Sequence, residues 1–94
     1  MGPIVRQRRI PPPELGPMLG RARLRAGYRL REAARLAGLN PSYLFKLESS
    51  QRVPSRTVAE ILAEVLRLDE AERAQLFAAA VGDAGRDHPL KRSA

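Results

Sequence analysis

The chain has 94 residues, of which 44% are hydrophobic and 29% charged, and its formal net charge is +7. A chain of this length buries one modest core, so we expect a single domain with tails. Cysteine is absent and His88 is the only histidine, which excludes disulfides and thiolate metal sites. We therefore expect no metal and no cofactor.

The positive charge is concentrated in the first part of the chain. Residues 1–56 contain twelve Arg or Lys against three Glu, a net of +9, whereas residues 57–94 contain five basic and seven acidic residues, a net of −2. This distribution suits a protein that offers one face to a polyanion such as nucleic acid. The alternative is a solvated, arginine-biased surface, since fifteen of the seventeen basic residues are Arg.

The amino terminus predicts no membrane anchor and no signal peptide, because no apolar run approaches the length of a membrane span. We expect a soluble, cytoplasmic protein. Residues 1–13 are basic and Pro-rich without helical periodicity, which predicts a flexible arm. A first helix is predicted over residues 14–26, where Leu15, Met18, Leu19 and Ala22 fall at helical spacing.

Two short helices follow around a tight turn. The second is predicted over residues 30–37, with Ala33, Ala34, Leu36 and Ala37 packing inward, and it ends at a residue suited to the left-handed conformation, Gly38. Asn40 is a helix cap and Pro41 a favoured first helical residue, so a third helix is predicted over residues 41–49. Its apolar face consists of Leu44 and Leu47.

The second half of the chain predicts two more helices. Ser55 caps a helix over residues 55–67, with an apolar stripe of Val58, Ile61, Leu62, Val65 and Leu66. Asp69 and Glu72 have the form of a capping box and open a helix over residues 69–81. Strand patterns are missing and residues 82–94 have the composition of a disordered tail. The fold class is therefore all-α, a compact five-helix bundle.

The segment "AARLAGLNPSYLFKLE" joins two helices through a Gly-centred turn, as in a helix-turn-helix. Together with the Pro54-Ser55 pair, it resembles the DNA-binding domain of the lambda repressor and Cro type, also called the xenobiotic response element family. The resemblance covers about residues 14–81. It implies a sequence-specific regulator of transcription that binds double-stranded DNA as a homodimer on an inverted repeat, with residues 41–49 in the major groove.

The resemblance also implies residues that contact the base edges: Pro41, Ser42, Tyr43 and Lys46. A serine donates to or accepts from either kind of base, and a lysine donates to guanine O6 and N7 or to a phosphate. The alternatives are a serine bonded to the backbone at the helix start and a solvated lysine. Arg23 and Glu48 match a pair that forms a largely buried salt bridge in relatives, so we expect them to stabilise the fold.

Contacts to the DNA backbone are implied at the start of the second helix and in the loop before the fourth. The residues there are Arg29, Arg31, Gln51, Arg52, Ser55 and Arg56. Donors at these places fix the register on the duplex but carry little sequence information. The arm residues Arg6, Arg8 and Arg9 either follow the backbone or a minor groove, or make no specific contact.

Several residues depart from the family pattern. Leu30 stands where many relatives have a Gln that bonds a phosphate, and Arg29 stands at a cap position where Ser or Thr is commoner. Ser50 replaces the usual Gly after the third helix, at a cost of about 1 kcal/mol if its backbone is left-handed. Phe45 occupies a position that is usually polar, and we favour packing onto the fourth helix over contact with a thymine methyl, with the DNA backbone or with a partner.

Two further predictions concern partners and activity. Residues Leu76, Phe77, Ala80 and Val81 form one side of the fifth helix and are either a dimer seam or a cap on the monomer core. The rival function is an adaptor or antitoxin that uses the fold to bind a protein partner through Phe45 and the fifth helix. No nucleophile with a neighbouring base appears, so we expect no enzyme, and without a sensor domain we expect no small-molecule ligand.

Overall fold

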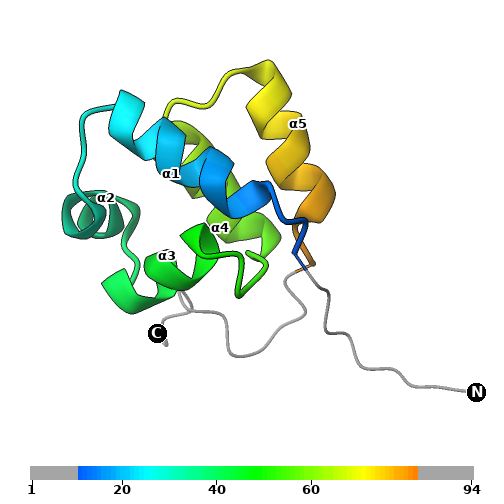
Figure 1. The fold of residues 1–94 in the computed structure, drawn as a ribbon, viewed down its shortest axis with the longest axis horizontal. Helices are drawn as coiled ribbons and strands as arrows, with labels where there is room; N and C mark the ends of the chain where they lie inside the picture. The colour runs from blue at the N-terminus through cyan, green and yellow to red at the C-terminus, as the bar shows by residue number, and fades with distance from the viewer. Residues whose placement is uncertain (1–10, 83–94) are drawn as a thin grey trace, which may run out of the picture.

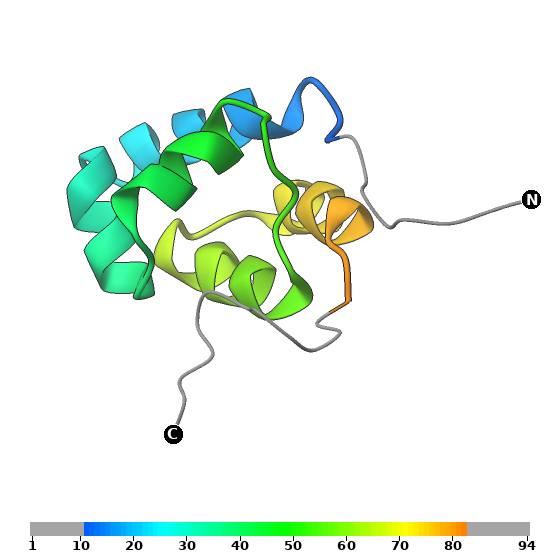
Figure 2. The same ribbon diagram turned by 90° about the horizontal axis from the view of Figure 1, so that it is seen from below.

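The structure, a computed structural model, describes residues 11–82 and consists there of five helices (Figure 1). The helices are α1 (Leu15–Arg25), α2 (Leu30–Ala37), α3 (Pro41–Glu48), α4 (Arg56–Val65) and α5 (Glu70–Ala79). The predicted all-α class is confirmed. Figure 2 shows α2 and α3 together at one end of the molecule and α5 at the other.

The core is built from the apolar faces of all five helices. The side chains that are buried completely include Leu15, Leu19, Leu44, Leu47, Val58, Leu62, Leu66 and Leu76. In α2 only alanines are buried, so this helix packs closely through small side chains. The prediction that Leu36 packs inward is wrong, because the side chain lies on the outer side of α2 and is 48% exposed.

Helix α1 begins without a cap of its own, since the side chain of Glu14 makes no capping hydrogen bond. The amide of Leu15 donates instead to the carbonyl of Pro12, 3.1 Å away. The amide of Gly16 donates to the hydroxyl of Ser50, which in turn donates to the carbonyl of Pro13. Residues 12 and 13 were predicted within the flexible arm, but these bonds attach them to the folded domain.

The turn between α2 and α3 has the geometry that its sequence predicts. Gly38 is left-handed, with φ 71°, and the amide of Leu39 donates across it to the carbonyl of Ala34 over 2.8 Å. The side chain of Asn40 accepts a hydrogen bond from the amide of Ser42, also at 2.8 Å. This cap fixes the point at which α3 begins.

Helix α4 ends earlier than predicted because Arg67 is left-handed. Its φ is 54°, and the amide of Leu68 donates back to the carbonyl of Ala63 over 3.0 Å. This is the same helix-ending arrangement that Gly38 forms, built here on a residue with a side chain. The buried side chain of Leu68 anchors it.

Helix α5 ends at Ala79, so the prediction that it continues to residue 81 is wrong. Ala80 has an extended backbone, and Val81 forms an isolated parallel β-bridge with Ser55. The amide of Val81 donates to the carbonyl of Pro54, and the amide of Arg56 donates to the carbonyl of Val81, at 3.0 and 2.9 Å. These two bonds satisfy backbone groups that a further helical turn would have used, and they join the end of α5 to the start of α4.

Candidate nucleic-acid interface

The outer face of α3 is the surface on which the predicted base-contacting residues lie. Ser42, Phe45, Lys46 and Ser49 are all exposed and follow the spacing of one helical face. The opposite face is fixed in the core by Leu44 and Leu47. Of the other two candidates, Pro41 is half-buried at the start of the helix and Tyr43 packs at the edge of the core.

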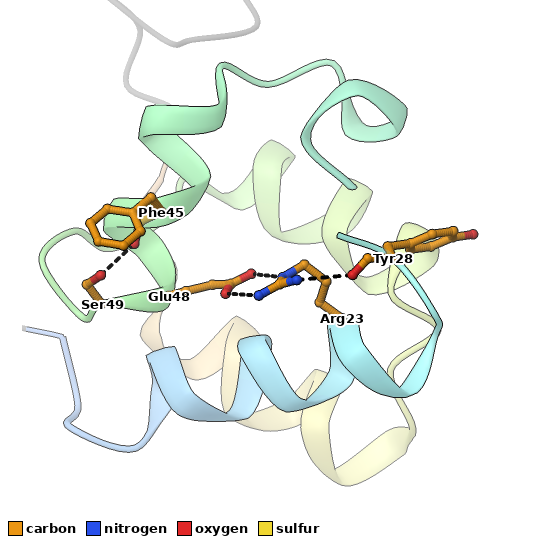
Figure 3. Close-up of polar contacts among 5 residues, drawn as sticks. All are labelled: Arg23, Tyr28, Phe45, Glu48 and Ser49. Atoms are coloured by element: carbon orange, nitrogen blue, oxygen red, sulfur yellow. Dashed lines mark hydrogen bonds and ion pairs between the residues drawn. The ribbon is translucent and has the colours of Figure 1, made fainter. Parts of the chain in front are cut away.

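The start of α3 leaves Ser42 available for an external partner. Its amide is satisfied by Asn40, so the capping role falls to that residue and not to the serine hydroxyl. Ser49 differs, because its hydroxyl donates to the carbonyl of Phe45 over 2.8 Å (Figure 3). The polar groups that this face presents are therefore Ser42 near its beginning and Lys46 one turn later.

Arg23 of α1 and Glu48 of α3 form a bidentate ion pair. The guanidinium Nε lies 2.7 Å from Glu48 Oε2 and Nη2 lies 3.0 Å from Oε1, while Nη1 donates to the carbonyl of Tyr28 (Figure 3). The two side chains are only 15% and 11% exposed. The pair joins α1, α3 and the loop after α1, and it neutralises the one carboxylate of α3.

Helices α1 and α3 approach closely because two glycines face the end of α3. A Cβ at Gly16 would overlap the backbone oxygen of Glu48, and one at Gly20 would lie 3.3 Å from its Oε1. A side chain at Gly16 would therefore displace α3 from α1. The position of the exposed face of α3 depends on this contact.

An open basic hollow of about 430 Å³ lies beside the start of α3. It is lined by Arg29, Arg31, Glu32, Arg35, Leu39 and Pro41. Arg29 and Arg31 were predicted to contact phosphate, whereas Arg35 was missed. The sequence feature that could have identified Arg35 is its position four residues after Arg31, which places both side chains on one face of α2. Three guanidinium groups against one carboxylate leave this hollow positively charged.

The loop from α3 to α4 forms the other side of the surface. Gln51, Arg52 and Arg56 are exposed, and the Gln51 amide is bound to the carbonyl of Lys46 at 2.8 Å. Ser55 is half-buried, and its hydroxyl accepts from the amide of Val58 as the cap of α4. Its side chain therefore has a structural role. The guanidinium of Arg56 also lies 5.8 Å from the ring centre of Phe77.

The residues that were predicted to form either a dimer seam or a cap on the monomer core do not share one environment. Leu76 is completely buried in the core of the monomer. Phe77 is half-buried, with the guanidinium of Arg73 5.5 Å and that of Arg56 5.8 Å from its ring centre. Ala80 and Val81 lie beyond the end of α5. Arginine charge therefore covers the largest half-buried side chain of this stretch.

A second ion pair lies away from α3, between α1 and α5. Arg25 and Glu72 form two hydrogen bonds of 2.8 and 2.9 Å. Glu72 also completes the predicted capping box. Its carboxylate accepts a hydrogen bond from the amide of Asp69, and the carboxylate of Asp69 accepts one from the amide of Glu72. The bonds from Arg25 and from the Asp69 backbone lower the pKa of Glu72 to about 2.

The arm residues Arg6, Arg8 and Arg9 and the tail over 83–94 lie outside the described residues. Within residues 11–82, no helix is long and apolar enough to cross a bilayer. The same part of the chain contains no group of three His, Cys, Asp or Glu side chains that is arranged to hold a metal ion.

Comparison with known proteins agrees with this geometry. Residues 14–76, more than half of the chain, match the family model described as a helix-turn-helix domain. No curated protein and no solved structure matches the sequence. The matched residues include the Gly38 turn, all of α3 and the Arg23–Glu48 pair. The chain belongs to the helix-turn-helix family, with a domain of the lambda repressor and Cro type.

Proposed function

We propose that this protein is a transcriptional regulator that binds specific double-stranded DNA sequences through α3. The observation that supports this most is the exposed face of α3. On it Ser42 follows Pro41 of the basic hollow, and the carbonyl of Lys46 is bonded to the amide of Gln51 in the loop that carries Arg52. An α-helix fits the major groove of B-DNA, where each base pair offers a distinct pattern of donors and acceptors. In this proposal Ser42 and Lys46 read base edges, with Pro41 and Tyr43 beside them.

The two basic groups flank α3 at places suited to the phosphates on either side of a groove. One is the hollow beside α2, with Arg29, Arg31 and Arg35. The other is the loop with Gln51 and Arg52, continued by Arg56 at the start of α4. We assign these residues to phosphate contact, which sets the register of α3 without reading sequence.

The charge of α3 itself favours a polyanionic partner. Its one carboxylate, Glu48, is turned toward α1 and bound by Arg23 at 2.7 Å. The outer face of the helix thus carries the positive charge of Lys46 without an opposing negative charge on that face. A duplex would meet a surface complementary to its phosphates.

We further propose that the protein acts as a homodimer on an inverted repeat in the cytoplasm and without catalysis. One helix-turn-helix buries little surface, and two-fold dimers place two such helices in successive major grooves. The half-sites would then lie about 34 Å apart, one helical turn. Bound to a promoter, such a dimer would act by occluding or recruiting polymerase.

Selection from random double-stranded DNA at about 150 mM salt tests this function. The enriched sequence is then titrated against a scrambled duplex of the same composition. We expect an enriched inverted repeat that binds much more tightly than its scrambled counterpart. Equal affinity for the two duplexes would contradict a sequence-specific regulator.

The second candidate, an adaptor or antitoxin that binds a protein, is favoured by one observation. Phe45 is 55% exposed on α3, contrary to the prediction that it packs onto the domain. Large exposed apolar side chains often mark partner surfaces. An adaptor would bind DNA weakly and without regard to sequence. Its affinity for DNA would come from contacts between basic residues and phosphates and would fall as the salt concentration rises.

A further inference from the structure

We propose that Phe45 is a specificity-determining residue that reads the 5-methyl group of a thymine in the major groove. The inference rests on the proposed DNA-binding function and extends it to a residue outside the expected set of base contacts. It assigns the third prominent side chain of the α3 outer face, after Ser42 and Lys46, to an apolar contact.

The position of Phe45 supports a role in the same groove. It follows Ser42 by three residues and precedes Lys46 by one, so all three side chains lie on the outer half of α3. Its ring is 55% exposed and is directed away from the Arg23–Glu48 pair (Figure 3). A duplex that contacted Ser42 and Lys46 would therefore also meet the ring.

The chemistry of the ring restricts what it can recognise there. A phenyl group has no hydrogen-bond donor or acceptor, and the apolar feature of the base edges in the major groove is the thymine methyl. One turn further along α3, the Ser49 hydroxyl donates to the carbonyl of Phe45, so its donor is used within the helix. Beyond Lys46, Ser49 therefore offers no free hydrogen-bond donor, and the ring of Phe45 is the apolar feature of the face between Ser42 and Lys46.

The surrounding charge favours DNA over a protein as the occupant of this face. Lys46 and Arg52, which follow Phe45 by one and seven residues, are both exposed. The carboxylate of Glu48 is neutralised by Arg23. An apolar protein surface placed over Phe45 would have to desolvate these cations without a partner of opposite charge. A duplex supplies phosphates for the cations and a methyl group for the ring.

The test uses the duplex obtained from selection, with each thymidine replaced in turn by deoxyuridine, whose base lacks only the 5-methyl group. We expect one thymine in each half-site at which this change lowers the affinity about fourfold, the effect of exposing one methyl-sized group. Phe45→Ala should lower the affinity for the unmodified duplex by a similar factor. With this variant, deoxyuridine and thymine should bind equally at that position.

Leu24→Ala is the matched control, because it removes another exposed apolar side chain, 66% exposed, from α1. It should keep the full difference between thymine and deoxyuridine. Thermal unfolding of both variants should match that of the original chain, since neither side chain is buried.

Two results would overturn the inference in distinguishable ways. If an inverted repeat is enriched but Phe45→Ala still discriminates deoxyuridine from thymine, the methyl contact is wrong and the proposed function stands. A protein partner would then be the remaining use of the ring. If selection enriches no sequence, the proposed function and the methyl contact are both wrong.

Discussion

The hydroxyl oxygen of Ser50 lies 3.3 Å from the amide nitrogen of Gly16, from which it accepts a hydrogen bond across 34 positions of sequence. Ser50 is left-handed, with φ 58°, a conformation that costs a residue with a side chain about 1 kcal/mol relative to glycine. In exchange it caps α1, whose own N-cap residue provides no acceptor. A cap of this kind contributes about 1 kcal/mol.

Substitutions at Ser50 should separate these two effects. Ser50→Ala keeps the left-handed strain and removes the cap, so we expect it to destabilise the domain by about 1 kcal/mol. Ser50→Gly removes both, and its free energy of unfolding should stay close to that of the original chain. Urea denaturation of both variants measures the difference. An Ala variant as stable as the original chain would show that the hydroxyl does not act as a cap, whereas equal stability of the Ala and Gly variants would show that the left-handed backbone carries no strain.

Breaking the Arg23–Glu48 pair should destabilise the domain by about 3 kcal/mol, since either single loss leaves a largely desolvated charge without its partner. Chemical denaturation of Glu48→Leu and Arg23→Met would measure this. The double variant should be less destabilised than the sum of the two single variants. Additive effects would mean that the two side chains do not act as a pair.

The Arg25–Glu72 pair should make part of the stability depend on acid pH. The folded pKa of Glu72 is about 2, below its ordinary value of 4.5. Its stabilising effect is therefore fully present above that ordinary value and declines as the pH falls towards 2. Unfolding free energies across this range should fall less steeply for Glu72→Gln than for the original chain.

Glu60→Gln provides the control for that measurement, because Glu60 is an exposed residue of α4 that also carries one negative charge. The Glu60 variant should follow the pH profile of the original chain. Identical profiles for the Glu72 variant and the original chain would argue against the pair as a source of stability.

Lys46 and Arg52 should affect DNA binding in different ways. If Lys46 reads a base, Lys46→Ala should weaken binding to the selected duplex by about 1 to 3 kcal/mol and relax the preference at one base step. Arg52→Ala should weaken selected and scrambled duplexes alike and reduce the salt dependence. Titrations of both variants against both duplexes measure this. An unchanged base preference in the Lys46 variant would remove it from the base contacts.

Much of the fold could be predicted from local patterns in the sequence. Gly38, Asn40 and Pro41 each favour one backbone conformation, and the second helix has the predicted bounds of residues 30–37. The capping box of Asp69 and Glu72 likewise depends on residues three apart. Local chemistry of this kind is readable without knowledge of the rest of the chain.

The predictions from sequence differ from the structure where distant parts of the chain meet. The end of α5 is set by hydrogen bonds from Val81 to the segment before α4, which no periodicity of residues 69–81 contains. Arg67 takes a left-handed conformation because Leu68 is buried in the core. The exposure of Phe45 and Leu36 depends on which helices cover which faces, and apolar spacing alone does not specify this.

The close contact of Gly16 with Glu48, together with the ion pair to Arg23, has a consequence for the proposed partner. These contacts fix the last turn of α3 to α1, which restricts how far the helix can tilt to suit a groove of different width. On binding, the adjustment would fall on the duplex, and its cost would depend on how readily each base step bends. Base pairs that no side chain touches would then contribute to sequence preference.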